Sequence, residues 1–441
     1  MKFSEHIGKG AWAFASRGLP LLYAIALIAV ARVIPKEEFG VLAVFQTFFT
    51  MIFSFSDSFA LQAIVKFGVE PEVVIEELVT MTTLLFLAFL GMALAILLLF
   101  PGIVSRLLNI PQLEPLMPYL AIFALFTTPR VVFSKVLQMR FRMKEIFFVD
   151  FANFGIASII LVIMMMLGKI QNAESVIRVT MVSGLLSSLV AIVLVRPFLR
   201  YRPKYSRAML ARISEFVRYQ AAAGLVSSAQ QNFDILIVSG FMGAVGVGVY
   251  NGAKMLFRGF YIIRDTMILF VFPATSKYHS RGEIGTLRII LEKSVSFLTL
   301  GLIPLGIVLA IGAPFIFHIL YGVKYDASIP VFRVLLISIL FFPMQTVFNA
   351  AMAGMGKIKE EFWIFTVSLV VNVILSAALL AFTHNLVGAA VAFAVASGVQ
   401  SVQLYFYIQK HVGLDKRQLW IRGFGDFFSY FRSLVARRNE A

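Results

Sequence analysis

The sequence predicts an all-α integral membrane protein with about twelve transmembrane helices, arranged as two six-helix lobes related by a pseudo-twofold axis. Three observations carry this prediction: the composition, the length of the apolar runs and an internal repeat. Of the 441 residues, 60% are hydrophobic and only 14% are charged, and the mean hydropathy is +0.88. This composition excludes an ordinary soluble domain, in which about 25% of residues are charged.

The apolar runs are long enough to cross about 30 Å of hydrocarbon as helices. They are expected, in chain order, at roughly 11–32, 39–65, 78–101, 115–137, 146–168, 176–196, 213–240, 243–276, 289–318, 328–352, 361–383 and 386–409. The run 243–276 is too long for one helix perpendicular to the membrane. It is therefore expected to tilt, or to bend near Gly259.

The positions of Lys and Arg set the orientation. With the N-terminus in the cytoplasm, the cytoplasmic segments hold 25 of these residues and the outer loops hold 6. Both termini are therefore expected in the cytoplasm, and the protein in the cell (inner) membrane. This asymmetry accounts for most of the net charge of +16, so nucleic-acid binding is not needed to explain it. The remaining eight basic residues lie inside the expected spans.

An internal repeat divides the chain. Comparing the chain with itself gives an offset of about 208–215 residues, at which Gly40-Val41-Leu42 matches Gly248-Val249-Tyr250. Each copy holds six spans, an even number, so both have the same orientation. The expected N-lobe is 1–204 and the C-lobe is 205–410, with a transport path between them.

Residues 411–441 are expected to form a cytoplasmic amphipathic tail. Its apolar positions recur at helical spacing: Phe427, Phe428, Phe431, Leu434 and Val435. Arg432, Arg437 and Arg438 flank them. This pattern is typical of an interfacial helix that lies on the membrane surface.

One apolar run carries a polar stripe. It consists of Lys254, Arg258, Tyr261 and Asp265, at i, i+4, i+7 and i+11. If the run 243–276 forms one helix, these side chains share a face about 60° wide. Charge at bilayer depth costs roughly 2.5–3.5 kcal/mol per side chain, so such a face normally points to a bundle interior or a wet cavity.

The equivalent stripe lies 208 residues earlier, as Gln46, Thr50, Phe53 and Asp57. The face is thus polar in both copies and cationic in one. This indicates a path for an anionic substrate, because ammonium and guanidinium groups pair with phosphate oxygens. The alternative is an internal salt-bridged stripe that only fastens helices together.

Four further residues are candidates for substrate binding. Arg17 precedes Pro20 in the first span, and Arg130 follows Pro129 in the fourth. Gln230 and Gln231 belong to a polar face of the seventh span. The alternatives are snorkelling of the arginines to the headgroups and hydrogen bonding of the glutamines between helices.

Three aspartates are candidates for ion coupling, namely Asp57, Asp234 and Asp265. A buried carboxylate can take up a proton or bind Na⁺. Lys135, Arg218, Arg333 and Asp150 lie near span ends, where snorkelling is a sufficient explanation. No catalytic residue and no metal site are expected, since the five histidines are scattered and cysteine is absent.

Two stretches resemble a known family. The first starts with Arg17 inside the first span and continues as Ala31-Arg32-Val33-Ile34-Pro35-Lys36-Glu37-Glu38-Phe39-Gly40 and Ser56-Asp57-Ser58-Phe59-Ala60-Leu61-Gln62. The second is Phe348-Asn349-Ala350-Ala351-Met352-Ala353-Gly354-Met355-Gly356-Lys357. Together they resemble the polysaccharide transporters, the Wzx-type flippases of the multidrug/oligosaccharidyl-lipid/polysaccharide (MOP) exporter superfamily. Many of these relatives have fourteen spans, whereas twelve are expected here.

The resemblance implies two lobes of the MATE/MOP type around a V-shaped cavity. It also implies movement of a polyprenyl-(di)phosphate-linked oligosaccharide from the cytoplasmic to the outer leaflet. The expected partners are this lipid-linked oligosaccharide and membrane lipids, together with glycan polymerases or glycosyltransferases of the same pathway, and not nucleic acid. No cofactor is expected, apart from coupling to Na⁺ or H⁺.

Two transport functions are the alternatives: a cation-coupled multidrug or metabolite antiporter and a lipid II flippase. An exporter of organic cations should have an acidic cavity, whereas the eight basic residues inside the spans outnumber the aspartates there. A membrane-embedded glycosyltransferase, ligase or polymerase is not expected. Such enzymes need charged residues on large outer loops, and the longest loop here, 102–114, holds only Arg106 and Glu114.

Overall fold

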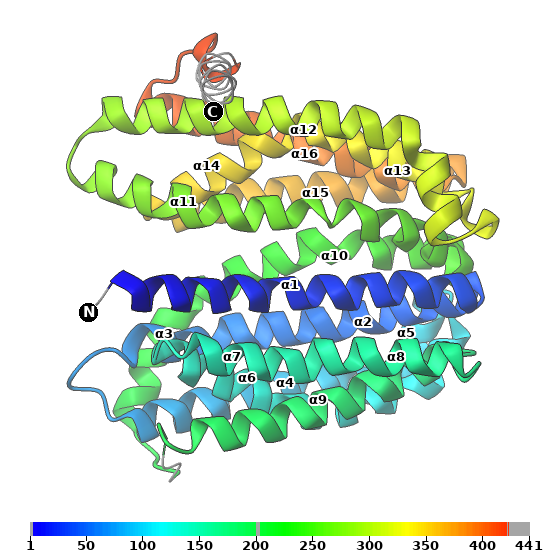
Figure 1. Cartoon of the computed structure of the whole chain (residues 1–441), viewed down its shortest axis with the longest axis horizontal. Coiled ribbons are helices and arrows are strands. Elements are labelled where there is room, and N and C mark those ends of the chain that lie inside the picture. Colours follow the sequence, from blue (N-terminus) through cyan, green and yellow to red (C-terminus); the bar gives the residue numbers. More distant parts are fainter. Residues whose placement is uncertain (1–2, 200–202, 421, 423–441) are drawn as a thin grey trace, which may run out of the picture. The chain divides into compact units, whose positions relative to one another are not determined.

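The computed structural model describes residues 3–199, 203–420 and 422, and all regular structure in these ranges is helical (Figure 1). The contacts divide the chain into two compact units. The first runs to Gly252 and includes Leu320–Lys324, and the second holds Ala253–Ile319 and the described residues from Tyr325 onward. The expected boundary between lobes at 204/205 follows the sequence repeat, and it stays a prediction.

The helices of the first unit are α1 (Phe3–Val33), α2 (Lys36–Ser56), η1 (Asp57–Leu61), α3 (Gln62–Phe67), α4 (Ile75–Leu99), α5 (Pro101–Leu107), η2 (Pro111–Leu116), α6 (Met117–Met139), α7 (Met143–Asp150), η3 (Phe151–Gly155), α8 (Ile156–Met166), α9 (Ala173–Val195) and most of α10 (Arg207–Phe257). Two of the short elements, η1 and η3, are π-helical. Each continues the helix before it, so α2–η1–α3 and α7–η3–α8 form two long rods.

The second unit holds α11 (Phe260–Ser280), α12 (Ile284–Leu320) except its last residue, α13 (Ser328–Ile337), η5 (Ser338–Leu340), α14 (Phe342–Gly354), α15 (Ile358–Thr383) and α16 (Leu386–Val412). The short helix η4 (Val323–Tyr325) starts in the first unit, which includes Val323 and Lys324. Within each unit the long helices run side by side (Figure 1). The expected amphipathic tail at 427–438 lies outside the described residues.

The helices confirm a multi-pass membrane protein. In the described ranges, ten helices are long and apolar enough to cross a membrane, or eleven if 328–340 and 342–354, bent by 51°, are one span. One of the ten, Gly224–Ser280, has 57 residues. A straight helix of that length would measure about 85 Å, nearly three times the hydrocarbon thickness. The expected span 243–276 and the larger part of 213–240 fall within this stretch, so the twelve-span layout fits.

Breaks in this long stretch lie where glycine permits them. Gly243 has φ 61° and ψ −167°, a conformation that other residues adopt only with strain. It separates the expected spans 213–240 and 243–276. A second break follows Phe257, where the amide of Gly259 donates to the carbonyl of Leu256 in a tighter turn than an α-helix has. The structure thus has a helix break near Gly259, where a bend was one of the two expectations.

The core of the first unit packs α6 and α9 closely. Ser187 and Ser188 on α9 donate to the carbonyls of Val149 and Phe126, which ties α9 to α7 and α6. Small residues and hydroxyls let transmembrane helices approach and replace the hydrogen bonds that water would supply. These contacts hold α6 in place, and α6 carries two of the charged residues described below.

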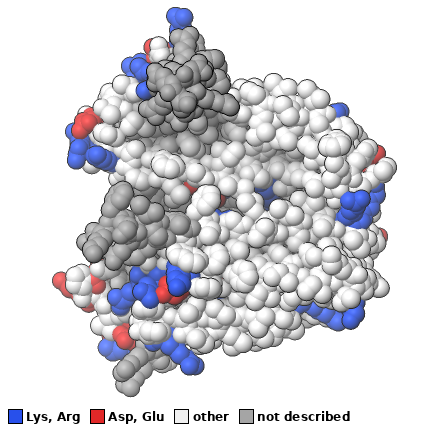
Figure 2. Space-filling view, in the orientation of Figure 1, with Lys and Arg blue, Asp and Glu red and all other residues white. Residues whose placement is uncertain are grey.

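The surface supports insertion in a membrane. Figure 2 shows Lys, Arg, Asp and Glu gathered toward two opposite margins of the view, with an almost uncharged surface between them. The exposed residues of the long helices include many large apolar ones, such as Leu99, Ile311 and Phe382. Lipid tails can cover such a surface, which water would disfavour.

Candidate functional site

The polar stripe does not lie on one helix. Lys254 is in the last turn of α10, Arg258 is in the break, and Tyr261 and Asp265 are on α11. The expectation of one face on one continuous helix is therefore wrong. The tighter turn at Arg258 and Gly259 interrupts the regular 100° per residue on which the common face depended.

Lys254 is enclosed in protein. Its side chain is only 1% exposed, whereas Arg258 is partly exposed. A lysine at bilayer depth is stable only inside the protein, where polar groups can surround its ammonium. In this conformation Lys254 is closed off from any ligand, whereas part of Arg258 is exposed.

On α11, Arg264 joins the residues of the stripe. Its guanidinium lies 4.5 Å from the centre of the Tyr261 ring, and its Nε donates to Asp265 Oδ1 at 3.1 Å. Tyr261 stacks on Phe342 of α14, with ring planes 5° apart. Tyr261 and Asp265 are thus both contacted by Arg264, which is not one of the four residues of the stripe.

In the first unit, Asp234 is buried. Its Oδ2 accepts a hydrogen bond from the hydroxyl of Tyr250 at 2.7 Å, and its Oδ1 accepts one from the amide of Ile235. Gln230 and Gln231, one turn before, are partly exposed, and Gln231 donates to the carbonyl of Ser227. These residues form a polar segment of α10 that is partly open beside Gln230.

Two ion pairs tie α6 to its neighbours. Arg130 donates to Asp150 Oδ1 at 3.1 Å, and Asp150 also accepts a hydrogen bond from the hydroxyl of Ser16 on α1. The Arg130 guanidinium lies over the Phe154 ring at 5.2 Å. Snorkelling, which was a sufficient explanation for Asp150 from the sequence, is wrong, since Asp150 pairs within the bundle.

The second pair joins Lys135 to Asp57. The Lys135 ammonium lies 2.9 Å from Asp57 Oδ1 and 3.0 Å from Oδ2, and Gln62 donates to Oδ2 at 2.9 Å. Snorkelling of Lys135 is also wrong. Arg17, beside Ser16 on α1, is exposed.

The aspartates of both pairs stand at π-helical turns. Asp57 is the first residue of η1, and Asp150 immediately precedes η3. Such turns occur often at functional sites, because the wider turn disrupts the regular ladder of backbone hydrogen bonds. No pattern in the sequence signalled either turn, and both lie inside ordinary apolar runs.

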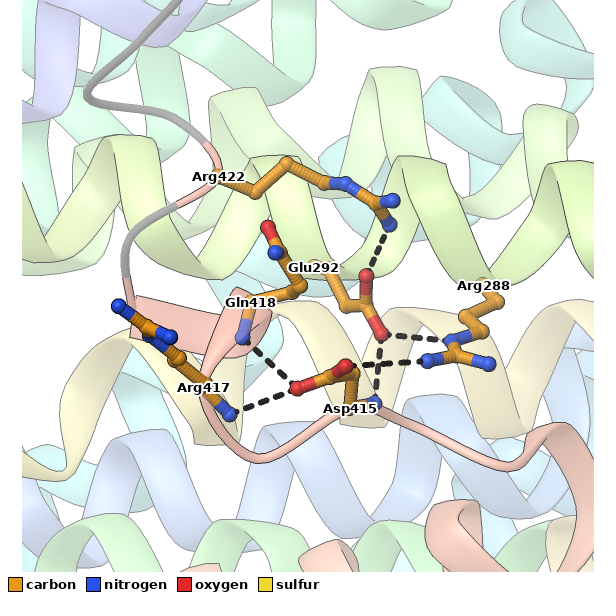
Figure 3. Close-up of polar contacts among 6 residues, drawn as sticks. All are labelled: Arg288, Glu292, Asp415, Arg417, Gln418 and Arg422. Atoms are coloured by element: carbon orange, nitrogen blue, oxygen red, sulfur yellow. Dashed lines mark hydrogen bonds and ion pairs between the residues drawn. The ribbon is translucent and has the colours of Figure 1, made fainter.

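A third charged cluster lies at the end of the second unit (Figure 3). Glu292 on α12 is fully buried and accepts from Arg288 Nε at 2.9 Å, from the amide of Asp415 at 2.7 Å and from Arg422. Arg288 also lies 3.6 Å from the Asp415 carboxylate. The chain after α16 is therefore fastened to α12. Residue spacing could indicate the Arg288–Glu292 pair, which lies four residues apart, but not the contacts with Asp415 and Arg422, which lie 123 and 130 residues from Glu292.

The long apolar helices and the charged pairs between them define a class: a polytopic, all-helical membrane protein. A family of polysaccharide biosynthesis proteins matches residues 29–330. This chain belongs to that family.

Solved transporters share the fold. An inward-facing multidrug resistance transporter of the MATE family, in the MOP superfamily, matches with a TM-score of 0.74 and 14% identity over 91% of this chain and 98% of that one. The lipid II flippase MurJ, in an inward closed conformation, matches with a TM-score of 0.74 and 12% identity over 97% and 92%. The MATE/MOP-like fold expected from the sequence is confirmed.

A relative by sequence is an uncharacterised membrane protein of Methanocaldococcus jannaschii. It is 26% identical over 193 residues, which are 42% of this chain and 43% of the relative. The match thus spans less than half the length of that relative.

Proposed function

We propose that the protein is a flippase for polyprenyl-(di)phosphate-linked oligosaccharides, which it moves from the cytoplasmic to the outer leaflet. Membership of a polysaccharide biosynthesis family supports a glycan substrate. The observation that carries the rest is the presence of basic residues at membrane depth in both units. A phosphate head group needs such partners, and a neutral or cationic substrate does not.

Under this proposal the transport is alternating access without chemical change of the substrate. A ligand shifts such an equilibrium only through its different affinity for the two states. Arg17, Arg130, Arg258 and Tyr261, with Gln230 and Gln231, would contact the head group and sugars. Lys254 would do so only in a conformation that opens its surroundings, because it is enclosed here.

Ion coupling belongs to the same proposal. Asp57, Asp234 and Asp265 each have a hydrogen-bond or ion-pair partner in this conformation. A carboxylate that loses its partner at membrane depth favours uptake of a proton or Na⁺. We place the protein in the cell membrane with both termini in the cytoplasm, beside the polymerases and glycosyltransferases of its pathway.

The test is flipping in proteoliposomes with a fluorescent lipid-linked oligosaccharide, together with complementation of a flippase-null strain. Arg258→Ala should fold and lose at least about tenfold in rate, which corresponds to one strong charge contact. Arg333→Ala is the matched control. Arg333 is an exposed basic residue of α13 that donates to the Ala310 carbonyl of its own unit, and its loss should leave the rate unchanged.

The competing functions give different results in the same vesicles. A drug antiporter would release an organic cation against Na⁺ or H⁺ and would leave the oligosaccharide unflipped. A lipid II flippase would move lipid II in preference. Either result would replace the proposal.

A further inference from the structure

Helix α6 carries two bases that face different neighbours. Arg130 and Lys135 are five residues apart, so they lie about 7.5 Å apart along the axis and about 140° apart around it. Arg130 pairs with Asp150, beside α1, and Lys135 pairs with Asp57, at the end of α2. The two bases therefore offer two separate anion-binding positions along α6, and not one position that both bases share.

These pairs differ from the ion pairs around Glu292. The four side chains of the α6 pairs are 17–21% exposed, whereas Glu292 is 0% exposed. A sealed pair cannot exchange partners without unfolding its surroundings. An ion pair that solvent reaches can exchange partners, because an incoming anion replaces the negative charge of the departing carboxylate.

Each aspartate has a second, neutral partner. Ser16 donates to Asp150, and Gln62 donates to Asp57. These donors would still bind the carboxylates after the bases had turned away. Arg130 also has a hydrogen-bond donor to spare, because its Nε is buried and donates no hydrogen bond here. A tetrahedral phosphate oxygen could accept from it, as guanidinium groups commonly bind phosphate through two nitrogens.

We propose that Arg130 and Lys135 form an anion-exchange site, in which Asp150 and Asp57 hold the two bases while no ligand is bound. A phosphate or diphosphate ester displaces the aspartates and takes over their bases. The inference deepens the proposed function, on which its physiological ligand rests. It gives the aspartates the role of resident counter-ions, which keep the empty site neutral at membrane depth.

Removing a counter-ion should tighten anion binding. In purified protein in nanodiscs, Asp57→Asn and Asp150→Asn should each bind inorganic pyrophosphate about two- to fivefold more tightly than the parent, the range expected when a partly exposed ion pair is broken. Lys135→Gln and Arg130→Gln should bind it at least about tenfold more weakly. Unchanged affinity in both asparagine variants would overturn the inference.

A charge swap separates binding from structure. Asp57→Lys combined with Lys135→Asp keeps an ion pair but moves the base from α6 to α2. This variant should regain the thermal stability lost by either single change, while pyrophosphate affinity stays low. If the swap restored pyrophosphate affinity as well as thermal stability, the ion pair would have only a structural role. The control swaps Arg281 with Glu283, a pair at 3.9 Å whose side chains are 59% and 43% exposed, and should change neither property.

Two probes separate the source of the phosphate. A polyprenyl diphosphate in the nanodisc should follow the same order of variants as pyrophosphate if the ligand is a lipid. If only pyrophosphate follows that order and no oligosaccharide is flipped, the exchange site stands and the flippase proposal fails. If flipping proceeds and neither probe responds to the variants, the flippase proposal stands and the exchange site is wrong.

Discussion

Gly40 and Gly248 pack reciprocally against each other's helices. A Cβ atom on Gly40 would lie 1.8 Å from the carbonyl oxygen of Ala244, and one on Gly248 would lie 2.0 Å from that of Lys36. Each carbonyl belongs to the residue four positions before the other glycine. Exchanging the two glycines therefore exchanges their contacts, as a local twofold axis requires. These are also the residues that the internal repeat aligns.

The first prediction concerns the contact between α2 and α10 at Gly40 and Gly248. Gly40→Ala or Gly248→Ala places a methyl group where a backbone oxygen lies, so α2 and α10 must separate. The free energy of unfolding in detergent should fall by about 3 kcal/mol, at the upper end for overpacking. Flipping should slow in the same variants, since the helix pair can no longer close.

The control for both variants is Gly91→Ala in α4. A Cβ on Gly91 meets nothing within 4 Å, and alanine favours a helix over glycine by about 1 kcal/mol. Gly91→Ala should therefore leave the protein as stable as before or slightly more stable. If Gly40→Ala is as stable as Gly91→Ala, the close approach of α2 and α10 is not needed for stability.

The spans could be predicted from the sequence because their length and apolarity are local properties. An interruption near Gly259 was one of two expectations for the overlong run 243–276, since a bilayer has room for only about 20 helical residues, and α10 and α11 are separate helices there. The ion pairs could not be predicted from the sequence, because Lys135 and Asp57 are 78 positions apart and no spacing rule joins them. The roles of Lys254 and Arg258 in binding stay predictions.

A second prediction concerns Glu292. Glu292→Gln leaves Arg288 and Arg422 near a neutral amide, and breaking a buried ion pair typically costs about 3 kcal/mol or more. We expect the segment 413–420 to detach from α12, with faster trypsin cleavage after Arg417. Glu283→Gln is the control, because Glu283 is exposed and lies 3.9 Å from Arg281. Equal cleavage of the two variants would show that Glu292 does not hold the segment.

The third prediction concerns acid. The amides of Gln418 and Arg417 donate to Asp415 and, with Arg288, lower the pKa of its carboxyl below the ordinary value of about 3.9. A carboxyl whose pKa is lower in the folded protein stabilises the fold at pH values above its unfolded-state pKa. This stabilisation is lost as the pH falls through the folded-state pKa. The segment should therefore stay docked at pH 5 and loosen below about pH 4.

Trp420 can report this change, because it lies in the same segment and its carbonyl accepts from Ser296 on α12. With Trp12 and Trp363 replaced by Phe, its emission should shift to longer wavelength in acid. Asp415→Asn should already show part of that shift at neutral pH and little further change on acidification. An acid shift of the same size in both proteins would assign the transition to another group.

The last prediction concerns Lys324, between α12 and α13. Its ammonium donates to the carbonyl of Ile34 at 2.6 Å, while burial and, to a smaller extent, the charge of Lys36 lower its pKa. The unfolded chain therefore binds this proton more tightly than the folded one, so stability should rise with pH between the lowered pKa and about 10.4. Lys324→Gln keeps a donor for Ile34 and has no charge to titrate. Its thermal midpoint should equal or exceed that of the parent at pH 7, and the alkaline rise should vanish. A rise of the same size in the glutamine variant would assign the alkaline effect to other lysines.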